Sequence, residues 1–433
     1  MVTCAELKES AQLKSCADTF TKEYMSRCGL TDAVTAHDRI IRVLDGFQST
    51  FGRKDGDQIA LFSAPGRTEI LGNHTDHQHG HVLCASVNID ILACAAPNNQ
   101  NIIRIHSVGY PEVVVELNSI LPIEGEEGTT AALVRGVVAE IAKLGYKVSG
   151  FDAYMISDVL SGSGLSSSAA FEVLIGNVIN AFFCAGQLDA VEIAKIGQYA
   201  ENVYFGKPCG LMDQIASAVG GVVSIDFADP AVPCVKFVDI DLNAYGHELC
   251  IIDTGSCHAD LTDDFADITR EMGAVAAFFG KKVLREVPEA EFTAAMSAVR
   301  DACGDRAVQR AMHFYADDLR AELGAQVLEQ GDFGKFLSLV NESGRSSEHY
   351  LQNICPSATP NQGEVSLALE VGKKLLDGVG AIRVHGGGFA GTVQAFVPAE
   401  KISQFKAGME EIFGPGSCHI LRIRPCGGCA MIG

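Results

Sequence analysis

Residues 161–168 read Ser-Gly-Ser-Gly-Leu-Ser-Ser-Ser, and they join a strand-like run at 151–156 to a helical run that begins at Ala169. Gly162 and Gly164 allow the backbone to come close to a ligand. The first turn of the following helix has unpaired N–H groups and the positive end of the helix dipole, which favour phosphate. Serine hydroxyls can cap such a helix or bind Mg²⁺. The loop therefore indicates a phosphate site, although a flexible loop with a serine cap would look the same.

This loop does not belong to the two commonest nucleotide-binding motifs. No Lys-Ser or Lys-Thr pair follows its second glycine, so it is not a Walker A loop. The sequence also lacks the V-A-I-K, H-R-D and D-F-G segments of protein kinases. If the chain binds ATP, it uses another fold.

The segments around the loop indicate a mixed protein. A polar helical stretch covers residues 1–50, a long apolar strand candidate covers 81–97, and 129–144 has helical periodicity. After residue 222, short strands and helices alternate: the strands at 222–227, 248–253, 380–384, 392–397 and 417–423, and the helices near 262–280, 304–330, 332–350, 362–376 and 400–413. We therefore expect an α+β fold in two lobes that share one site.

Composition limits the classes of partner and compartment. The chain has 433 residues, with 33 basic and 54 acidic side chains and a formal charge of −21. Such a surface repels nucleic acid and anionic lipid. No apolar run reaches the roughly 18–20 residues that span a bilayer, and residues 1–22 contain no hydrophobic block, so we expect no secretory signal. The 15 cysteines lie in apolar stretches typical of reduced thiols, which predicts a cytoplasmic protein.

Three blocks occur in order along the chain: residues 63–76 (SAPGRTEILGNHTD), residues 162–170 (GSGLSSSAA) and residues 383–391 (RVHGGGFAG). A Gly-x-Met-Asp-Gln segment at 210–214 lies between the second and the third. In order and spacing they resemble the GHMP small-molecule kinases, and within them the galactokinases, whose first block has the pattern G-R-x-N-x-I-G-E-H-T-D. The resemblance covers roughly residues 35–433.

The resemblance implies a two-lobed GHMP kinase fold with the active site in the cleft. A helical prefix would occupy residues 1–34. Residues 35–205 would form an N-terminal lobe like domain 2 of ribosomal protein S5, with a left-handed βαβ unit. Residues 206–417 would form a ferredoxin-like C-terminal lobe, and a final strand at about 418–433 would return to the first lobe.

The resemblance also implies the activity and its residues: phosphorylation of a sugar at C1 by ATP with Mg²⁺. Asp213 would face the anomeric hydroxyl with Arg67 beside it, and Ser168 and Glu201 would bind Mg²⁺. Asp76 would hold ring hydroxyls, within a substrate-binding set of Asn73, His74, Asp76, Phe265 and Gly210. The ATP phosphates would lie along Gly162, Ser163, Gly164, Leu165, Ser166, Ser167 and Ser168.

The chemistry of these residue types agrees with that assignment. Phosphoryl transfer needs mainly positioning and charge neutralisation. A carboxylate, a hydroxyl and water molecules suit Mg²⁺. Arg67 near Asp213 would keep the pKa of that carboxyl below about 3.9, so Asp213 would be a weak base that orients the nucleophile and accepts its proton late. Taken singly, Asp213 could cap a helix, and Glu201 and Arg67 could be surface residues.

Two positions depart from the galactokinase pattern. The chain has Asn73 where galactokinases have a Glu that is expected to hold the C6 hydroxyl. Residues 258–265 match a galactokinase segment that ends in Tyr, so Phe265 lacks the phenolic hydroxyl. Loss of the negative charge at position 73 would favour a C6-carboxylate sugar, and the run Asp76-His77-Gln78 resembles plant galacturonate kinases. Galactose or a close analogue comes first, with galacturonate as the alternative.

A rival of another class is an ATP- and sugar-binding sensor without catalysis, as some galactokinase relatives are. Such a sensor is expected to lack part of the loop or the base, whereas Arg67, Ser168, Glu201 and Asp213 are all present here. We expect small-molecule partners only, sugar and ATP, in a monomer, with a homodimer as the alternative.

Overall fold

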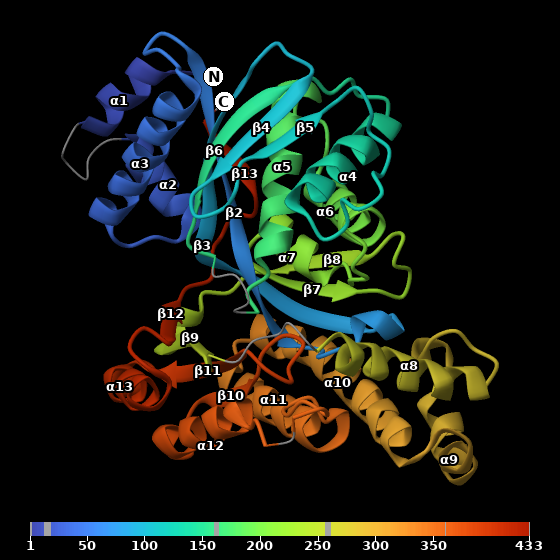
Figure 1. The fold of residues 1–433 in the computed structure, drawn as a ribbon. Helices are drawn as coiled ribbons and strands as arrows, with labels where there is room; N and C mark the ends of the chain where they lie inside the picture. Colours follow the sequence, from blue (N-terminus) through green and yellow to red (C-terminus); the bar gives the residue numbers. More distant parts are fainter. Residues whose placement is uncertain (1, 13–18, 160–163, 256–260, 360, 433) are drawn as a thin grey trace.

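A computed structural model describes residues 2–12, 19–159, 164–255, 261–359 and 361–432 (Figure 1). Two sheets organise it, a larger one of nine strands and a smaller one of four. The α+β prediction is confirmed. In the described part of the chain, no helix is both long enough and apolar enough to cross a bilayer.

The larger sheet is built around two long antiparallel strands, β2 (Gln58–Leu71) and β3 (His81–Pro97). Its main order is β1-β2-β3-β6-β4-β5, with β13 paired to β2, and β7 paired to both β3 and β8. The other strands are β1 (Val2–Thr3), β4 (Ile102–Ser107), β5 (Val113–Glu116), β6 (Phe151–Ser157), β7 (Val222–Asp226), β8 (Cys234–Val238) and β13 (Cys429–Ile432).

Helices cover both faces of this sheet (Figure 1). Ile59 and Leu61 of β2 pack in one core with Val43, whereas Ala60 and Phe62 belong to the other core. This alternation follows from the two-residue period of a strand and explains why residues 59–62 of β2 are apolar on both faces. The helices are α1 (Cys4–Gln12), α2 (Thr19–Cys28) and α3 (Ala33–Phe51) on the first face, and α4 (Thr130–Lys143), α5 (Ser167–Phe183), α6 (Ala190–Tyr199) and α7 (Met212–Val219) on the second.

The smaller sheet has the order β10-β11-β9-β12 with all neighbours antiparallel. Its connections follow the ferredoxin-like β-α-β-β-α-β pattern. The elements are β9 (His247–Asp253), α8 (Thr262–Phe278), α9 (Glu289–Cys303), α10 (Asp305–Glu329), α11 (Phe333–Ser346), α12 (Glu364–Leu376), β10 (Ala381–Val384), β11 (Thr392–Pro398), α13 (Ile402–Phe413) and β12 (Cys418–Leu421). Val365 and Phe405, from α12 and α13, pack on Ile252 of β9.

Sheet membership differs from the lobe limits expected from the sequence. Residues 206–417 were assigned to the second lobe, but β7 and β8 pair within the larger sheet. The single final strand expected at about 418–433 is two strands: β12 pairs with β9 in the smaller sheet, and β13 pairs with β2. Strand pairing is long-range, and the local pattern does not specify it. The limits of the lobes themselves stay a prediction.

A buried carboxylate ties the first helices to the C-terminal segment. Asp90 on β3 is fully buried, and its oxygens lie 2.7 Å from Arg39 Nη1 and 3.1 Å from Arg424 Nη1. Ser63 Oγ donates to the same carboxylate. Burial raises the pKa of Asp90, but Arg39 and Arg424 outweigh that effect and hold it below its usual value. Asp90 is therefore ionised and paired on both sides.

Asp90→Asn should lower the free energy of unfolding by about 3–5 kcal/mol, because it leaves the buried Arg424 without a carboxylate and Arg39 with only the exposed Asp158. Urea denaturation followed by circular dichroism measures this. Asp158→Asn is the matched control: it removes the exposed partner of Arg39 and should cost less than about 1 kcal/mol. Equal losses in the two variants would contradict the structural role of Asp90.

Candidate active site

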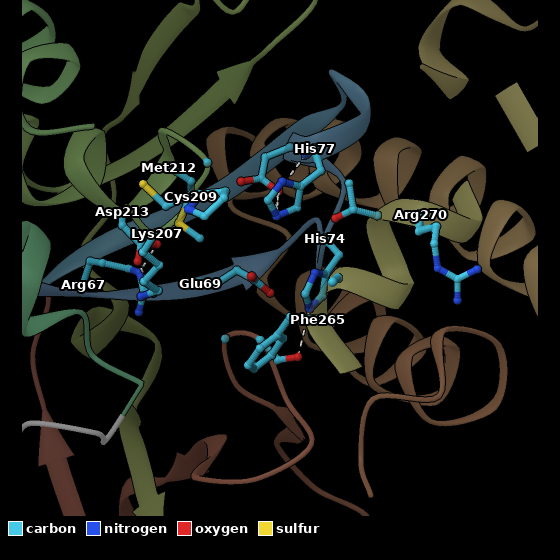
Figure 2. A pocket seen from close by; sticks show the side chains of 17 residues that line it. Arg67, Glu69, His74, His77, Lys207, Cys209, Met212, Asp213, Phe265 and Arg270 are labelled. Atoms are coloured by element: carbon cyan, nitrogen blue, oxygen red, sulfur yellow. Dashed lines mark hydrogen bonds and ion pairs between the residues drawn. The ribbon is translucent and has the colours of Figure 1, made fainter. Parts of the chain in front are cut away.

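A cavity of about 680 Å³ lies between the end of β2, the loop before α7, and the smaller-sheet half of the molecule (Figure 2). Polar and charged groups from both halves converge on it. Its lining consists of Arg67, Glu69, His74, Asp76, His77, Lys207, Pro208, Cys209, Gly210, Met212, Asp213, Phe265, Ala266, Thr269, Arg270, Gly386 and Gly387.

Arg67 and Asp213 form a two-pronged ion pair at one end of the cavity. Arg67 Nε and Nη2 lie 2.6 and 2.7 Å from Asp213 Oδ1 and Oδ2. Ser166 Oγ also donates to Asp213 Oδ2, at 2.6 Å. Burial raises the pKa of Asp213, but Arg67 and then Ser166 lower it below its usual value. The structure thus brings together the two residues that the sequence analysis assigned to catalysis, with the aspartate ionised.

The glycine–serine loop lies directly beside this pair. Arg67 Nη1 donates to the Gly164 carbonyl, and the Arg67 amide donates to the Leu165 carbonyl at 3.1 Å. Leu165 is fully buried and anchors the loop in the core. Ser166 precedes α5 in a left-handed conformation (φ 59°) and turns its hydroxyl to Asp213 instead of capping the helix. Gly162 and Ser163 lie outside the described residues.

Ser168 and Glu201 meet at the start of α5. Ser168 Oγ donates to Glu201 Oε1 at 3.3 Å, and Lys207 Nζ lies 3.4 Å from the same oxygen. Gln214 Nε2 donates to Glu201 Oε2 and to Glu172 Oε2, both at 3.0 Å. Burial and the neighbouring Glu201 raise the pKa of Glu172 well above its usual value. Gln214 therefore holds Oε2 of Glu201, the oxygen that does not contact Ser168.

This donor set fits Mg²⁺. A hydroxyl and a carboxylate oxygen are the hard ligands that this ion takes, with water and phosphate completing its shell. Among the residues that the structure describes, no three His, Cys, Asp or Glu side chains form a group that could hold a metal by themselves. A hydroxyl and one carboxylate would leave most of the ion's ligands to water and phosphate.

The opposite end of the cavity holds the residues expected to bind a sugar. A Cβ atom at Gly210 would lie 1.9 Å from Asp76 Oδ2, so any other residue there would clash with the Asp76 carboxylate. His74 Nε2 lies 2.9 Å from the Gly387 carbonyl, and burial with the nearby His77 lowers the pKa of His74 to about 4. Phe265 stacks on His74 with ring centroids 6.3 Å apart.

Asn73 corrects an expectation from the sequence. It is fully buried and does not line the cavity. Its Nδ2 donates to Glu69 Oε1 at 2.9 Å and to the Gly386 carbonyl at 2.7 Å, while Asn353 Nδ2 donates to its Oδ1. Direct binding of a sugar by Asn73 is therefore wrong for this arrangement. The inference that this pocket has lost a carboxylate is also wrong, because Glu69 lines the cavity.

Several lining residues escaped the sequence analysis, chiefly Glu69, Lys207 and Arg270. A signal existed for Glu69, which follows Arg67 by two residues on one strand, so that both lie on the same face. The segment matched to galactokinases before Phe265 includes residues 258–260, which lie outside the described part of the chain.

Two family models match the chain. GHMP kinases N terminal domain matches residues 132–221, and Galactokinase galactose-binding signature matches residues 45–97. The chain is 30% identical to the galactokinase of Streptomyces coelicolor over 363 residues, which cover 84% of this chain and 91% of that one. It is 31% identical to the galactokinase of Actinobacillus pleuropneumoniae serotype 3 over 347 residues, 79% of this chain and 86% of the relative.

Solved structures show the same fold. Lactococcus lactis galactokinase complexed with galactose superposes with a TM-score of 0.75 at 23% identity, over 89% of this chain and 97% of that one. Methanococcus jannaschii mevalonate kinase superposes with a TM-score of 0.61 at 13% identity, over 84% and 98% of the two chains. With galactokinase relatives at 30% identity over most of its length, the chain belongs to the galactokinase family of the GHMP kinases and is an ATP-dependent sugar kinase.

Proposed function

We propose that the protein transfers the γ-phosphoryl group of ATP to the anomeric C1 hydroxyl of galactose or a close analogue, giving sugar 1-phosphate and ADP. The observation that carries this proposal is the Arg67–Asp213 pair. It lies in the cavity and contacts the loop before α5 through Ser166 and Gly164. One ion pair thus borders both a sugar-sized space and a helix N-terminus suited to phosphate.

The nucleotide would bind with its phosphates along residues 162–168. Gly164 would let the loop backbone come close to the phosphates. The first turn of α5 would offer them N–H groups and the positive end of the helix dipole. Ser168 and Glu201 would hold Mg²⁺, which when bound neutralises charge on the phosphate oxygens. Lys207 adds a positive charge beside Glu201. These residues would bind and position the nucleotide and its Mg²⁺. The loose transition state of phosphoryl transfer needs little beyond positioning and charge neutralisation.

Asp213 would orient the C1 hydroxyl toward the phosphate and accept its proton late in the transfer. Arg67 stabilises the ionised form of Asp213, which makes it a weak base. A weak base does not deprotonate a sugar hydroxyl before attack, so the main contribution of Asp213 would be to orient that hydroxyl. On the other side of the cavity, Asp76, His74 and Phe265 would hold the sugar ring, with Gly210 leaving room for Asp76.

Galacturonate stays the alternative substrate, and the cavity bears on it in two ways. The Arg270 guanidinium lines the cavity and would attract a sugar carboxylate. Glu69 also lines the cavity, and a carboxyl oxygen there suits a sugar hydroxyl better than a second carboxylate. Because the Arg270 side chain is 67% exposed and pairs with Asp267, its attraction for a carboxylate is screened, which favours a neutral sugar. The expectation of a monomer stays a prediction.

A coupled ADP-release assay over galactose, galacturonate, glucuronate, N-acetylgalactosamine, arabinose and glucose should give the highest kcat/KM with galactose. Asp213→Asn should lower kcat by about 10²–10⁴-fold, since it removes the charged group that orients the C1 hydroxyl and accepts its proton late. Asp226→Asn, an aspartate outside the cavity lining, is the control and should retain kcat. A higher kcat/KM with galacturonate would support the alternative, and sugar binding without ADP release would support a sensor.

Glu201→Gln should raise the Mg²⁺ concentration for half-maximal activity by at least about tenfold, because even outer partners of a metal site have effects of that size. Titration of Mg²⁺-dependent ADP binding by calorimetry checks the same change without turnover. Glu140→Gln, on the surface of α4, is the control. Unchanged Mg²⁺ dependence in Glu201→Gln would remove Glu201 from the proposed metal site.

The single-turnover rate at saturating sugar should not follow a titration of Asp213 above about pH 5. The folded pKa of Asp213 lies below its usual value of 3.8, so this carboxylate stays ionised until the pH falls below that value. Rapid-quench measurements across the pH range check this. A rate that rose with a single ionisation near neutral pH, and lost that dependence in Asp213→Asn, would show instead that Asp213 is a tuned general base.

A further inference from the structure

Glu69 is a carboxylate of the cavity that the proposed chemistry does not use. It follows Arg67 by two residues on β2, so both side chains leave the strand on the same face, about 7 Å apart along it. A pyranose ring with its hydroxyls can span that distance. Figure 2 shows the Glu69 carboxylate directed into the cavity between Arg67 and His74.

The contacts of Glu69 are concentrated on one oxygen. Asn73 Nδ2 donates to Oε1 at 2.9 Å, and Arg383 Nη2 donates to the same atom at 3.0 Å. Within the described ranges no donor reaches Oε2, although Glu69 is only 4% exposed. Oε2 is not among the fully buried unpaired atoms either, so it borders the cavity. A nearly buried carboxylate oxygen without a donor is costly, and a ligand hydroxyl would satisfy it.

The sequence gives an independent reason to assign this atom to a ligand. The galactokinase pattern G-R-x-N-x-I-G-E places an amide at the position of Glu69 and a carboxylate at the position of Asn73. This chain has the two groups in exchanged order. The structure shows Glu69 and Asn73 hydrogen-bonded to each other. The chain therefore keeps one carboxylate and one amide at these two positions, but the carboxylate extends from strand β2 and the amide from the turn after it.

We propose that Glu69 is the carboxylate with which this chain selects its sugar: Oε2 accepts a hydrogen bond from a ring hydroxyl, while Asn73 and Arg383 hold Oε1. This inference rests on the proposed function, because it assigns a substrate contact within the same site. Asn73 is then a positioning residue, and Arg383 supplies the charge that makes a buried carboxylate tolerable.

The charges around Glu69 give the contact a pH dependence. Burial raises the pKa of Glu69 to about 7; Arg383 and Arg67 lower it, while Asp317 and Asp76 raise it. His74, His313 and His385 face the same region from the turn, α10 and the loop after β10, and each has a pKa below its usual value and is neutral near pH 7. An ionised oxygen is the stronger acceptor. Sugar affinity should therefore rise as the pH rises through about 7.

Galactose and its 2-, 3-, 4- and 6-deoxy analogues test the contact, in calorimetric binding and in the ADP-release assay. Glu69→Gln should raise the KM and Kd for galactose by about 10- to 100-fold, the range for a hydrogen bond to a charged group, and should flatten the pH dependence of sugar affinity near 7. The KM for ATP should not change. One deoxy sugar, the one without the bonded hydroxyl, should bind wild type and Glu69→Gln equally.

An equal loss of affinity for every sugar in Glu69→Gln would overturn the inference, because a purely structural role would act in that way. An unchanged Kd for galactose would overturn it too. Glu69→Asp keeps a charge near Arg383 but withdraws the carboxylate from the cavity, so it should fold and show the same hydroxyl-specific loss. It keeps the inference falsifiable if Glu69→Gln is unstable.

Asp152→Asn is the matched control, a buried carboxylate whose oxygens lie 2.8 Å from Arg53 and Arg104 outside the cavity lining. It should lower the melting temperature without a hydroxyl-specific effect. The binding arm separates the two proposals. If wild type binds sugars but phosphorylates none, the proposed function fails and the deoxy series still decides on Glu69. If wild type binds no sugar, both proposals fail.

Discussion

The buried guanidinium of Arg67 is the contact on which the site depends. It extends from β2, holds both oxygens of Asp213 at the start of α7, and donates to the carbonyl before α5. A buried ion pair contributes little net stability, because desolvation offsets most of the attraction. Its consequence here is geometric: it fixes the distance between the loop before α5, which is proposed to face a nucleotide, and Asp213, which is proposed to face an acceptor hydroxyl. The two-sided core around β2 and β3 supplies the stability that makes such a contact possible.

Three carboxylates, Glu69 on β2, Asp90 on β3 and Asp213 on α7, show how pairing and exposure together distinguish a structural role from a functional one. Asp90 has arginines on both oxygens and no exposed surface, so nothing remains for a ligand. Asp213 is paired with Arg67 but keeps about 29% of its side chain exposed to the cavity. Glu69 is nearly as buried as Asp90, but both of its donors lie on a single oxygen. Asp90, which is fully buried and has arginines on both oxygens, holds segments together and accordingly lies away from the cavity.

Much of the fold was readable from the sequence because its signals are local. The strand–loop–helix at 151–170 and the order of the three glycine-containing blocks predicted the GHMP kinase fold, and Arg67 and Asp213 do meet. Sheet membership of β7, β8 and β12 was not readable, since pairing joins segments far apart in sequence. The assignment of Asn73 failed for a different reason. Gly72 and His74 both have positive φ angles, and this turn directs the Asn73 side chain behind the cavity.

The charge of the nucleotide end bears on the form in which ATP would enter. Asp213 and Glu201 place two carboxylates beside the start of α5, in a chain of net charge −21. Arg67 pairs with Asp213 and balances its charge, whereas the cation beside Glu201 is Lys207, whose side chain is 64% exposed. A triphosphate that approached alone would meet the Glu201 carboxylate, which is 4% exposed and therefore screened less by solvent than Lys207. A nucleotide that carried its divalent ion would present that ion to Ser168 and Glu201 at the proposed metal site, so this arrangement would favour the metal–nucleotide complex over free ATP.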